Sequence, residues 1–234
     1  MYLSQLFADD EDESGQIEEC RMLVRTYAFT ENAIVSMGDN KLSAWEKMQL
    51  DMIYDDFDQD LFWRRVDAKN IFNKFNQTTD EQPEERKQLL KQLFGSIGEN
   101  VYIEPTFKCE FGKNIYIGND VYINFGAVLL DCSRITIGNN VLIGPNVGMY
   151  SANHSLDPEE RAQGALIGGR ITIGDKAWIA GDVKIMAGVT IGEGAVIGCG
   201  SIVTHDIPPR VVAAGNPCRV IRPITDADKV GFVK

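Results

Sequence analysis

The chain has 234 residues, of which 44% are hydrophobic and 24% are charged, a composition typical of a globular protein with one large domain or two modest ones. The net charge of −11 is concentrated at the N-terminus, because residues 1–39 contain two Arg and nine Asp or Glu, giving −7 and leaving −4 for the rest. The sequence lacks the Lys and Arg clusters that phosphate backbones or anionic lipid headgroups attract, which argues against nucleic acid and membrane partners.

Cysteine usage and the N-terminal sequence bear on the compartment. The five cysteines are odd in number and form no C-x-x-C pair, which argues against a disulfide framework and a thiolate zinc site. They are Cys20, Cys109, Cys132, Cys199 and Cys218. The chain shows neither the basic and apolar segments of a signal peptide nor an apolar run long enough to span a bilayer. We therefore expect a cytoplasmic protein without a metal requirement.

Residues 1–39 form an acidic extension that opens with the run DDEDES and shows no sustained hydrophobic period. The segment RMLVRTYAF fits a strand or a short helix equally well. We expect a disordered extension, and Met37 leaves an overextended start of translation as an alternative.

Three helical segments lie in residues 40–97. Ser43 and Glu46 form the S-x-x-E pattern of a capping box, which predicts a helix beginning in SAWEKMQLDMIY. Apolar residues recur at three- and four-residue spacing in DLFWRRVDAKNIFNKF, and PEERKQLLKQLFG opens on proline and ends at Gly95. Such a helical cap is too small to hold much core alone, so we expect it to dock on the C-terminal part of the chain.

From about residue 101 the hydrophobic period becomes six residues. The aliphatic positions are Ile117, Ile123 and Leu129, then after a two-residue slip Ile137, Ile143 and Met149, and finally Ile173, Ile179, Ile185, Ile191, Ile197 and Val203. Six residues make one short strand and one turn, and three such faces close a triangular coil whose aliphatic side chains stack inward. Chance recurrence in an ordinary sandwich would have to keep all these positions in phase. We therefore predict a mainly β, parallel β-helix over residues 98–224, with a tail over 225–234.

One stretch interrupts the repeat. Residues 149–164, MYSANHSLDPEERAQG, form a polar loop that carries His154, one of only two histidines in the chain.

The quoted segments resemble those of the hexapeptide-repeat acyltransferases, and more narrowly the maltose and galactoside O-acetyltransferase group. The resemblance covers residues 43 to about 224 and rests on EKMQLDMIYDDFDQDL, IGPNVGMYSANHSLDPEER, ITIGDKAWIAGDVKIMAGVTIG and GSIVTHDIPPRVVAAGNPCRVIR. It implies a left-handed β-helix, a homotrimer with active sites between subunits, and transfer of an acetyl group from acetyl-CoA to a hydroxyl of a sugar or sugar-like acceptor.

The resemblance also implies roles for individual residues. His154 is the expected general base, a function that typically accelerates a reaction about 10²–10⁴-fold, and the alternative is an ordinary surface histidine. Acceptor contacts are expected from Asn124, Asp131, Tyr122, Asp56 and Arg65. Cofactor contacts are expected from Gly181, Cys199, Thr204, Arg219 and Arg222. Turn, core or solvated surface roles remain the alternatives for these residues.

Three departures from the family pattern limit what can be transferred. His205 replaces a usual Lys after Thr204, Leu166 stands where many relatives have Glu, and Arg170 stands where they have Pro. We therefore leave the acceptor open. A zinc carbonic anhydrase of this fold needs three histidines per site, which two cannot supply. A catalytically silent hexapeptide-repeat assembly or binding subunit remains the alternative function.

Overall fold

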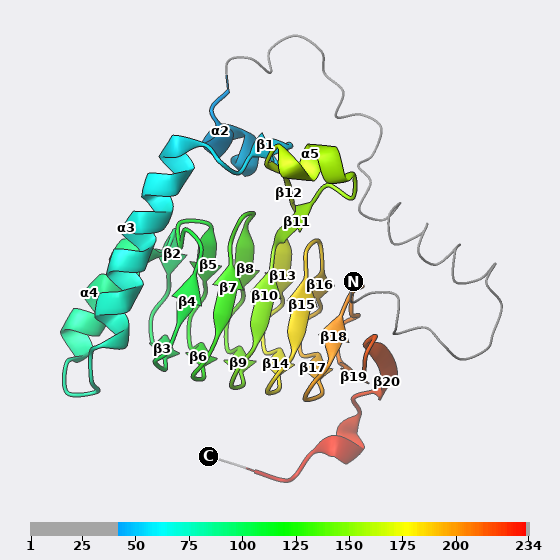
Figure 1. Cartoon of the computed structure of the whole chain (residues 1–234). Coiled ribbons are helices and arrows are strands. Elements are labelled where there is room, and N and C mark those ends of the chain that lie inside the picture. Colours follow the sequence, from blue (N-terminus) through cyan, green and yellow to red (C-terminus); the bar gives the residue numbers. More distant parts are fainter. Residues whose placement is uncertain (1–41, 233–234) are drawn as a thin grey trace, which may run out of the picture. The chain divides into compact units, whose positions relative to one another are not determined.

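The structure is a computed structural model that describes residues 42–232; the acidic extension, with Cys20 and Met37, lies outside the described residues. All three predicted helices are present: α2 (Ala44–Gln49), α3 (Gln59–Asn76) and α4 (Pro83–Leu93) (Figure 1). The predicted capping box is confirmed, because the Ser43 hydroxyl accepts from the Glu46 N–H while the Glu46 carboxylate accepts from the Ser43 N–H. No helix in the described part of the chain is both long and apolar enough to cross a bilayer.

The six-residue repeat builds a parallel β-helix with three faces, each of them one sheet. Face I contains β2 (Ser96–Ile97), β5 (Ile115–Ile117), β8 (Ile135–Ile137), β13 (Ile171–Ile173) and β16 (Thr190–Ile191). Face II contains β3 (Tyr102–Ile103), β6 (Tyr122–Ile123), β9 (Leu142–Ile143), β14 (Trp178–Ile179), β17 (Val196–Ile197), β19 (Val211–Ala214) and β20 (Arg219–Pro223). Face III contains β4 (Lys108–Cys109), β7 (Val128–Leu130), β10 (Gly148–Tyr150), β15 (Lys184–Met186) and β18 (Ile202–Val203).

The core of the β-helix is the column of aliphatic residues that the sequence predicts, and every predicted position is buried. Neighbouring strands of each face run parallel in register, so that Ile123, for example, lies beside Ile143. The last strand, β20, is different because it pairs antiparallel with β19. A short 3₁₀ helix, η2 (Asp226–Asp228), lies in the tail.

The slip in the repeat has a structural cause at the corner where the chain passes from face III to face I, which we call the III–I corner. The steps from Cys109 to Ile117 and from Leu129 to Ile137 are longer than the regular step from Ile185 to Ile191. In the next coil, the chain leaves the β-helix altogether at this corner, between β10 and β13, and forms the polar loop. Three successive coils therefore carry extra residues at one place.

The helical cap docks on the first coil, as predicted. Phe72 and Phe75 of α3 and Leu90 of α4 continue the hydrophobic core of the β-helix. The Asn76 side-chain amide bonds both the N–H and the C=O of Phe107, each at 2.8 Å, and Arg86 donates to the carbonyl of Ile103 at 2.6 Å. Strand β2 begins at Ser96, slightly before the expected boundary at residue 98.

The segment that includes α2 covers the III–I corner instead. It forms a second hydrophobic cluster, separate from the main core, with the corner and the loop. Its buried members are Ala44, Met48, Tyr54, Leu61, Phe111, Cys132 and Leu166.

Candidate functional site

The loop that carries His154 is an ordered excursion from the coil. It consists of β11 (Ala152–His154), α5 (Pro158–Ala162) and β12 (Ala165–Gly168). β12 pairs antiparallel with β11 on one side and with β1 (Tyr54–Asp55) on the other. Figure 1 shows this small sheet and α5 standing above the coils beside α2. The register places His154 opposite Leu166, and Leu166 opposite Tyr54.

The His154 side chain is exposed at the end of β11. Within residues 42–232, no side chain or backbone group forms a hydrogen bond or an ion pair with its ring. An imidazole that is held by its backbone but has free ring nitrogens can accept a proton from a bound hydroxyl. The geometry therefore suits a general base.

Asp56 and Arg65, two of the expected acceptor contacts, lie together. The Arg65 guanidinium forms an ion pair with the Asp56 carboxylate, donates to the Asp56 carbonyl at 3.0 Å, and forms an ion pair with Glu110 at 2.5 Å. Burial acts to lower the pKa of Arg65, but the two carboxylates outweigh it and raise that pKa above its ordinary value. Sequence reasoning did not single out Glu110, which lies in the long step from Cys109 to Ile117.

Asp131 does not reach the surface. Its carboxylate accepts hydrogen bonds from the backbone N–H groups of Glu110 at 3.0 Å, Phe111 at 2.8 Å and Asn114 at 3.2 Å, and no part of the residue is exposed. Burial raises the pKa of Asp131 to about 6, although hydrogen bonds from backbone N–H groups, that of Phe111 foremost, act to lower it. Asp131, expected as an acceptor contact, thus orders the III–I corner within one chain, because it satisfies the extra backbone groups that the slip creates.

Tyr122 and Asn124 lie elsewhere on the β-helix. Tyr122 projects from face II, where its ring stacks on Tyr102 with centroids 5.9 Å apart and its hydroxyl donates to Glu104 at 3.1 Å. Asn124 follows β6 at the corner between faces II and III, the II–III corner, and its side chain accepts from the Phe125 N–H at 2.8 Å. Within one chain, neither residue lies at the III–I corner that carries His154.

Two of the expected cofactor contacts lie on successive coils of the II–III corner. Gly181 follows β14, Cys199 follows β17, and the Gly200 N–H donates to the Gly181 carbonyl at 3.0 Å. Cys199 is an exposed free thiol. Thr204 lies across face III, at the end of β18, where its hydroxyl is 2.9 Å from Nδ1 of His205. Face III is thus bordered by Gly181 and Cys199 on one side and by Thr204 and the His154 loop on the other.

Arg219 and Arg222 project from β20 and are both exposed. Arg222 forms a two-point ion pair with Asp228, with nitrogen to oxygen distances of 2.9 and 2.7 Å. The bond from Arg222 lowers the pKa of Asp228 to about 2. A phosphate that binds the Arg222 guanidinium therefore either displaces the Asp228 carboxylate or binds beside it.

The structure accounts for two of the departures from the family pattern. Leu166 is buried in the second hydrophobic cluster, against α2 and β1. Arg170 forms an ion pair with Asp51, which lies just after α2, at 2.6 Å. Both residues join the loop to the segment that covers it. Among residues 42–232, no group of His, Cys, Asp or Glu could hold a metal ion.

Comparisons with known proteins agree with these features. Residues 47–98 match the family model of the maltose acetyltransferase hexapeptide capping motif, and residues 170–205 match that of the bacterial transferase hexapeptide, in six repeats. The galactoside O-acetyltransferase of Escherichia coli K12 is 43% identical over 189 residues, covering 81% of this chain and 93% of that protein. A maltose O-acetyltransferase structure from Clostridium difficile 630 has a TM-score of 0.77 at 42% identity, covering 79% of this chain and 99% of its own. A hexapeptide-repeat acetyltransferase from Vibrio cholerae, solved with acetyl coenzyme A, has a TM-score of 0.74 at 40% identity, covering 79% and 100%.

Proposed function

The chain belongs to the maltose and galactoside O-acetyltransferase family of hexapeptide-repeat acyltransferases, and from that premise we propose that it transfers the acetyl group of acetyl-CoA to a hydroxyl of a sugar or sugar-like acceptor. The observation that carries the proposal is the exposed ring of His154, which has no hydrogen-bond partner within residues 42–232, on a loop raised from the coils. The proposed compartment is the cytoplasm, because Cys109, Cys132, Cys199 and Cys218 are free thiols.

In the proposed reaction His154 takes the proton of the acceptor hydroxyl as that oxygen attacks the thioester carbonyl carbon. A C–O bond forms, the C–S bond breaks, and the proton on His154 passes to the departing sulfur, so the base is regenerated. A hydroxyl is a weak nucleophile at neutral pH, which is why a positioned base matters. Asp56 and Arg65, whose charges are held by mutual pairing, are the proposed acceptor contacts nearest to this loop in the fold.

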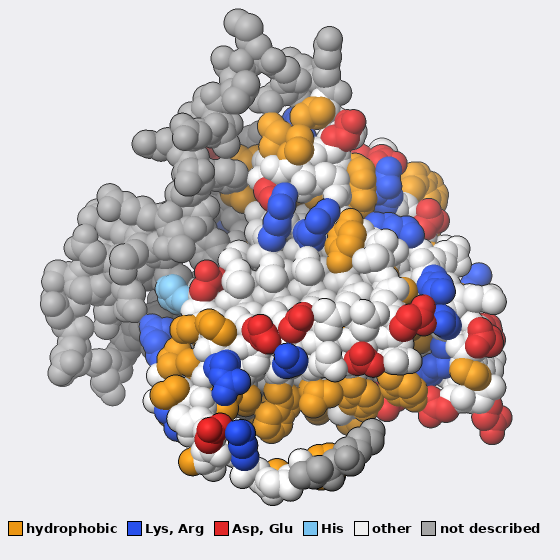
Figure 2. Space-filling view, turned by 180° about the vertical axis from the view of Figure 1, so that it is seen from behind, with side chains coloured by type: hydrophobic (Ala, Val, Ile, Leu, Met, Phe, Trp, Pro, Cys, Tyr) orange, Lys and Arg blue, Asp and Glu red, His pale blue; other side chains and the backbone are white. Residues whose placement is uncertain are grey.

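We further propose that the active unit is a homotrimer with each site between two subunits. Tyr122 and Asn124 are the other proposed acceptor contacts. They lie on a different side of the β-helix from His154, so in a trimer they would face the His154 loop of a neighbouring subunit. Face II supports such contact, because Tyr102, Leu142 and Trp178 project from it in one register and are 39%, 51% and 50% exposed. Figure 2 shows a row of hydrophobic side chains along the lower edge of the coils, and contiguous exposed apolar surface is typical of interfaces.

For the acetyl donor, the proposed groove runs along the corners that border face III. The Gly181 and Cys199 positions would face the pantetheine arm and Thr204 its reacting end. Arg219 and Arg222 would face the nucleotide phosphates, because guanidinium groups bind phosphate through paired, charge-assisted hydrogen bonds.

An acetyl-transfer screen tests the function. The purified chain is incubated with acetyl-CoA and monosaccharides, disaccharides, amino sugars or simple glycosides, and products are identified by mass and by the ester or amide linkage formed. Product mass is preferable to thiol release, since Cys199 is an exposed thiol. We expect an O-acetyl ester with at least one hydroxyl acceptor. Acetyl-CoA binding without product from any acceptor would favour the silent assembly subunit.

A subunit-mixing experiment tests the trimer. Light scattering should give about three times the 26.0 kDa chain mass. When His154→Ala and Asn124→Ala chains, each impaired alone, are refolded together, mixed trimers should recover activity in the sites that combine two intact halves. A fully active monomer, or mixtures as impaired as the separate variants, would exclude a site between subunits.

A further inference from the structure

Asp51 occupies a backbone position that favours glycine. It comes directly after the C-cap of α2, where the Asp51 N–H donates to Met48 and the Met52 N–H donates to Lys47, the two bonds that end a helix in a Schellman motif. Its φ of 55° lies in the left-handed region, which most side chains avoid. Holding an aspartate in this backbone conformation costs free energy that a glycine does not cost, so the contacts of the Asp51 side chain need an explanation.

The Asp51 carboxylate joins two different coils. One oxygen accepts from the Ser133 hydroxyl at 2.7 Å, and the other pairs with Nε of Arg170 at 2.6 Å. Ser133 lies in the III–I corner of one coil, and Arg170 is the last residue before β13 in the next. The segment after α2 is therefore tied to the corner and to the end of the His154 loop by one side chain.

The connection continues to the beginning of the loop. The Ser133 N–H donates to the Ser151 hydroxyl oxygen at 2.8 Å, and the Gly169 N–H donates to the Ser151 carbonyl at 2.8 Å. Ser133 and Ser151 are buried, so water competes little with these bonds. Ser151 precedes β11, which ends at His154. Both ends of the loop are thus held through Ser133 and Asp51, a set that we call the loop clamp: Asp51, Ser133, Ser151 and Arg170.

The clamp also fixes the register of the small sheet. β1 contains only Tyr54 and Asp55, and so short a strand specifies its pairing weakly by itself. Because Asp51 anchors the chain just before β1, Tyr54 is set against Leu166 and, through Leu166, against His154. A slip of one residue would turn these side chains to opposite faces.

We propose that Asp51 is a positioning residue for acetyl transfer, acting through Ser133 and Arg170 to hold His154 against the acceptor. The proposal rests on the proposed function, in which His154 is the base. Arg170 is 54% and Asp51 30% exposed at the side chain, and an ion pair of such groups contributes little stability. The effect of the clamp should therefore fall on turnover, which is sensitive to displacements of about 1 Å, rather than on folding.

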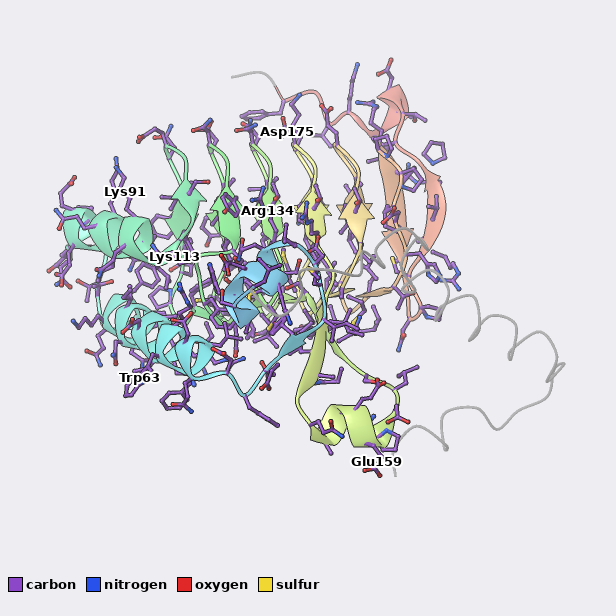
Figure 3. All side chains as sticks on the ribbon, turned by 90° about the horizontal axis from the view of Figure 1, so that it is seen from above. Trp63, Lys91, Lys113, Arg134, Glu159 and Asp175 are labelled. Carbon is purple, nitrogen blue, oxygen red and sulfur yellow. The ribbon has the colours of Figure 1, made fainter. Side chains whose placement is uncertain are left out.

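Asp51→Gly is the decisive variant, because it removes the carboxylate and suits the left-handed backbone. We expect kcat to fall about tenfold to a hundredfold, with KM for acetyl-CoA and the melting temperature little changed. Lys176→Gly is the matched control: Lys176 also has a positive φ, 58°, and an ion pair, with Glu193 at 3.3 Å. It lies beside Asp175, which Figure 3 shows on the opposite side of the coils from Glu159 of α5, and it should keep the wild-type kcat.

Further variants separate positioning from general damage. Arg170→Ala should match the loss in Asp51→Gly, Arg170→Lys should recover part of it, and combining Asp51→Gly with Arg170→Ala should add little, since both break one link. Hydrogen exchange gives a readout besides activity: amides of residues 152–154 and 165–168 should exchange faster in Asp51→Gly and not in Lys176→Gly.

The outcomes distinguish the clamp from the function it serves. An Asp51→Gly enzyme with wild-type kcat, or with unchanged exchange in residues 152–154 and 165–168, overturns the clamp while leaving acetyl transfer intact. If His154→Ala retains full turnover, the proposed role of His154 as the base fails, and Asp51 then has no base to position; a wild-type chain that acetylates no acceptor overturns the proposed function itself. Faster exchange together with a selective loss of kcat is the result that supports the proposal.

Discussion

The regular coils and the III–I corner differ in what they bury. Between Ile171 and Val203 the interior is a column of aliphatic side chains, with Ser201 as its one buried polar residue, and the six-residue step is never broken. The III–I corner instead buries polar residues in three successive coils, namely Asn114, Asp131, Ser133 and Ser151. A buried apolar side chain stabilises the fold wherever it contacts other apolar atoms, whereas a buried polar group needs a specific hydrogen-bond partner. The comparison teaches that the stabilising column and the proposed catalytic loop occupy separate regions, so mutations should separate their effects.

The largest effect should come from His154→Ala, which we expect to lower kcat about 10²–10⁴-fold, as removal of a general base does. Because the ring makes no bond within the described chain, the melting temperature and the Kd for acetyl-CoA should stay the same. The matched control is Leu156→Ala on the same loop, where the side chain is 76% exposed. Wild-type turnover in His154→Ala would make the histidine a bystander.

The converse variant lies in the coils. Ile185→Ala removes a fully buried side chain from β15, between β10 and β18, and should lower the free energy of unfolding by about 2–5 kcal/mol. The kcat of the folded protein should be unchanged. Denaturant unfolding checks the predicted free energy of unfolding. It is measured at one fixed protein concentration, since assembly can shift the apparent midpoint. An unchanged midpoint would mean that the column is not what stabilises the fold.

Asp131 offers a pH test of the corner. Its folded pKa, raised to about 6, lies above the ordinary value of 3.8, so the folded state holds the proton more tightly. The stability that this group contributes is therefore present below about pH 4 and is lost as pH rises through about 6, a change of roughly 3 kcal/mol. The melting temperature of the wild type minus that of Asp131→Asn should fall from pH 4 to pH 7. A difference that is constant, or rises with pH, would contradict the assignment.

The smallest effect should come from the arginines of β20. Replacing Arg219 or Arg222 with Ala should raise KM for acetyl-CoA about tenfold, with kcat little changed, because one charge-assisted pair contributes about 1.5–3 kcal/mol. Wild-type affinity should weaken as salt rises, and both variants should show a shallower salt dependence. Unchanged KM and equal salt slopes would place the donor phosphates elsewhere. This measurement sharpens the comparison, because it tests whether the C-terminal end of the β-helix binds acetyl-CoA as well as stabilising the fold.

Local and periodic features were predictable from the sequence, and long-range ones were not. The capping box of Ser43 and the buried position of Ile185 can be derived from spacing alone, since helix ends and coil faces are set by neighbours in the chain. The burial of Asp131 depends on backbone groups of the preceding coil, which no spacing displays. The contact between Arg170 and Asp51 joins residues far apart in sequence, so only their meeting in the fold explains the departure at Arg170.

The two ends of the β-helix determine how long it is. A stack of parallel coils has no natural end, because each open edge offers N–H and C=O groups to another coil, and such edges are how fibres grow. Asn76 occupies both backbone groups of Phe107, and β20 turns back on β19 at the other end. Asn76 at one end and the antiparallel strand β20 at the other are thus two local stops that the repeat itself does not supply. Whole coils can be inserted between these stops without creating a new edge, and each would lengthen face III by about 4.8 Å.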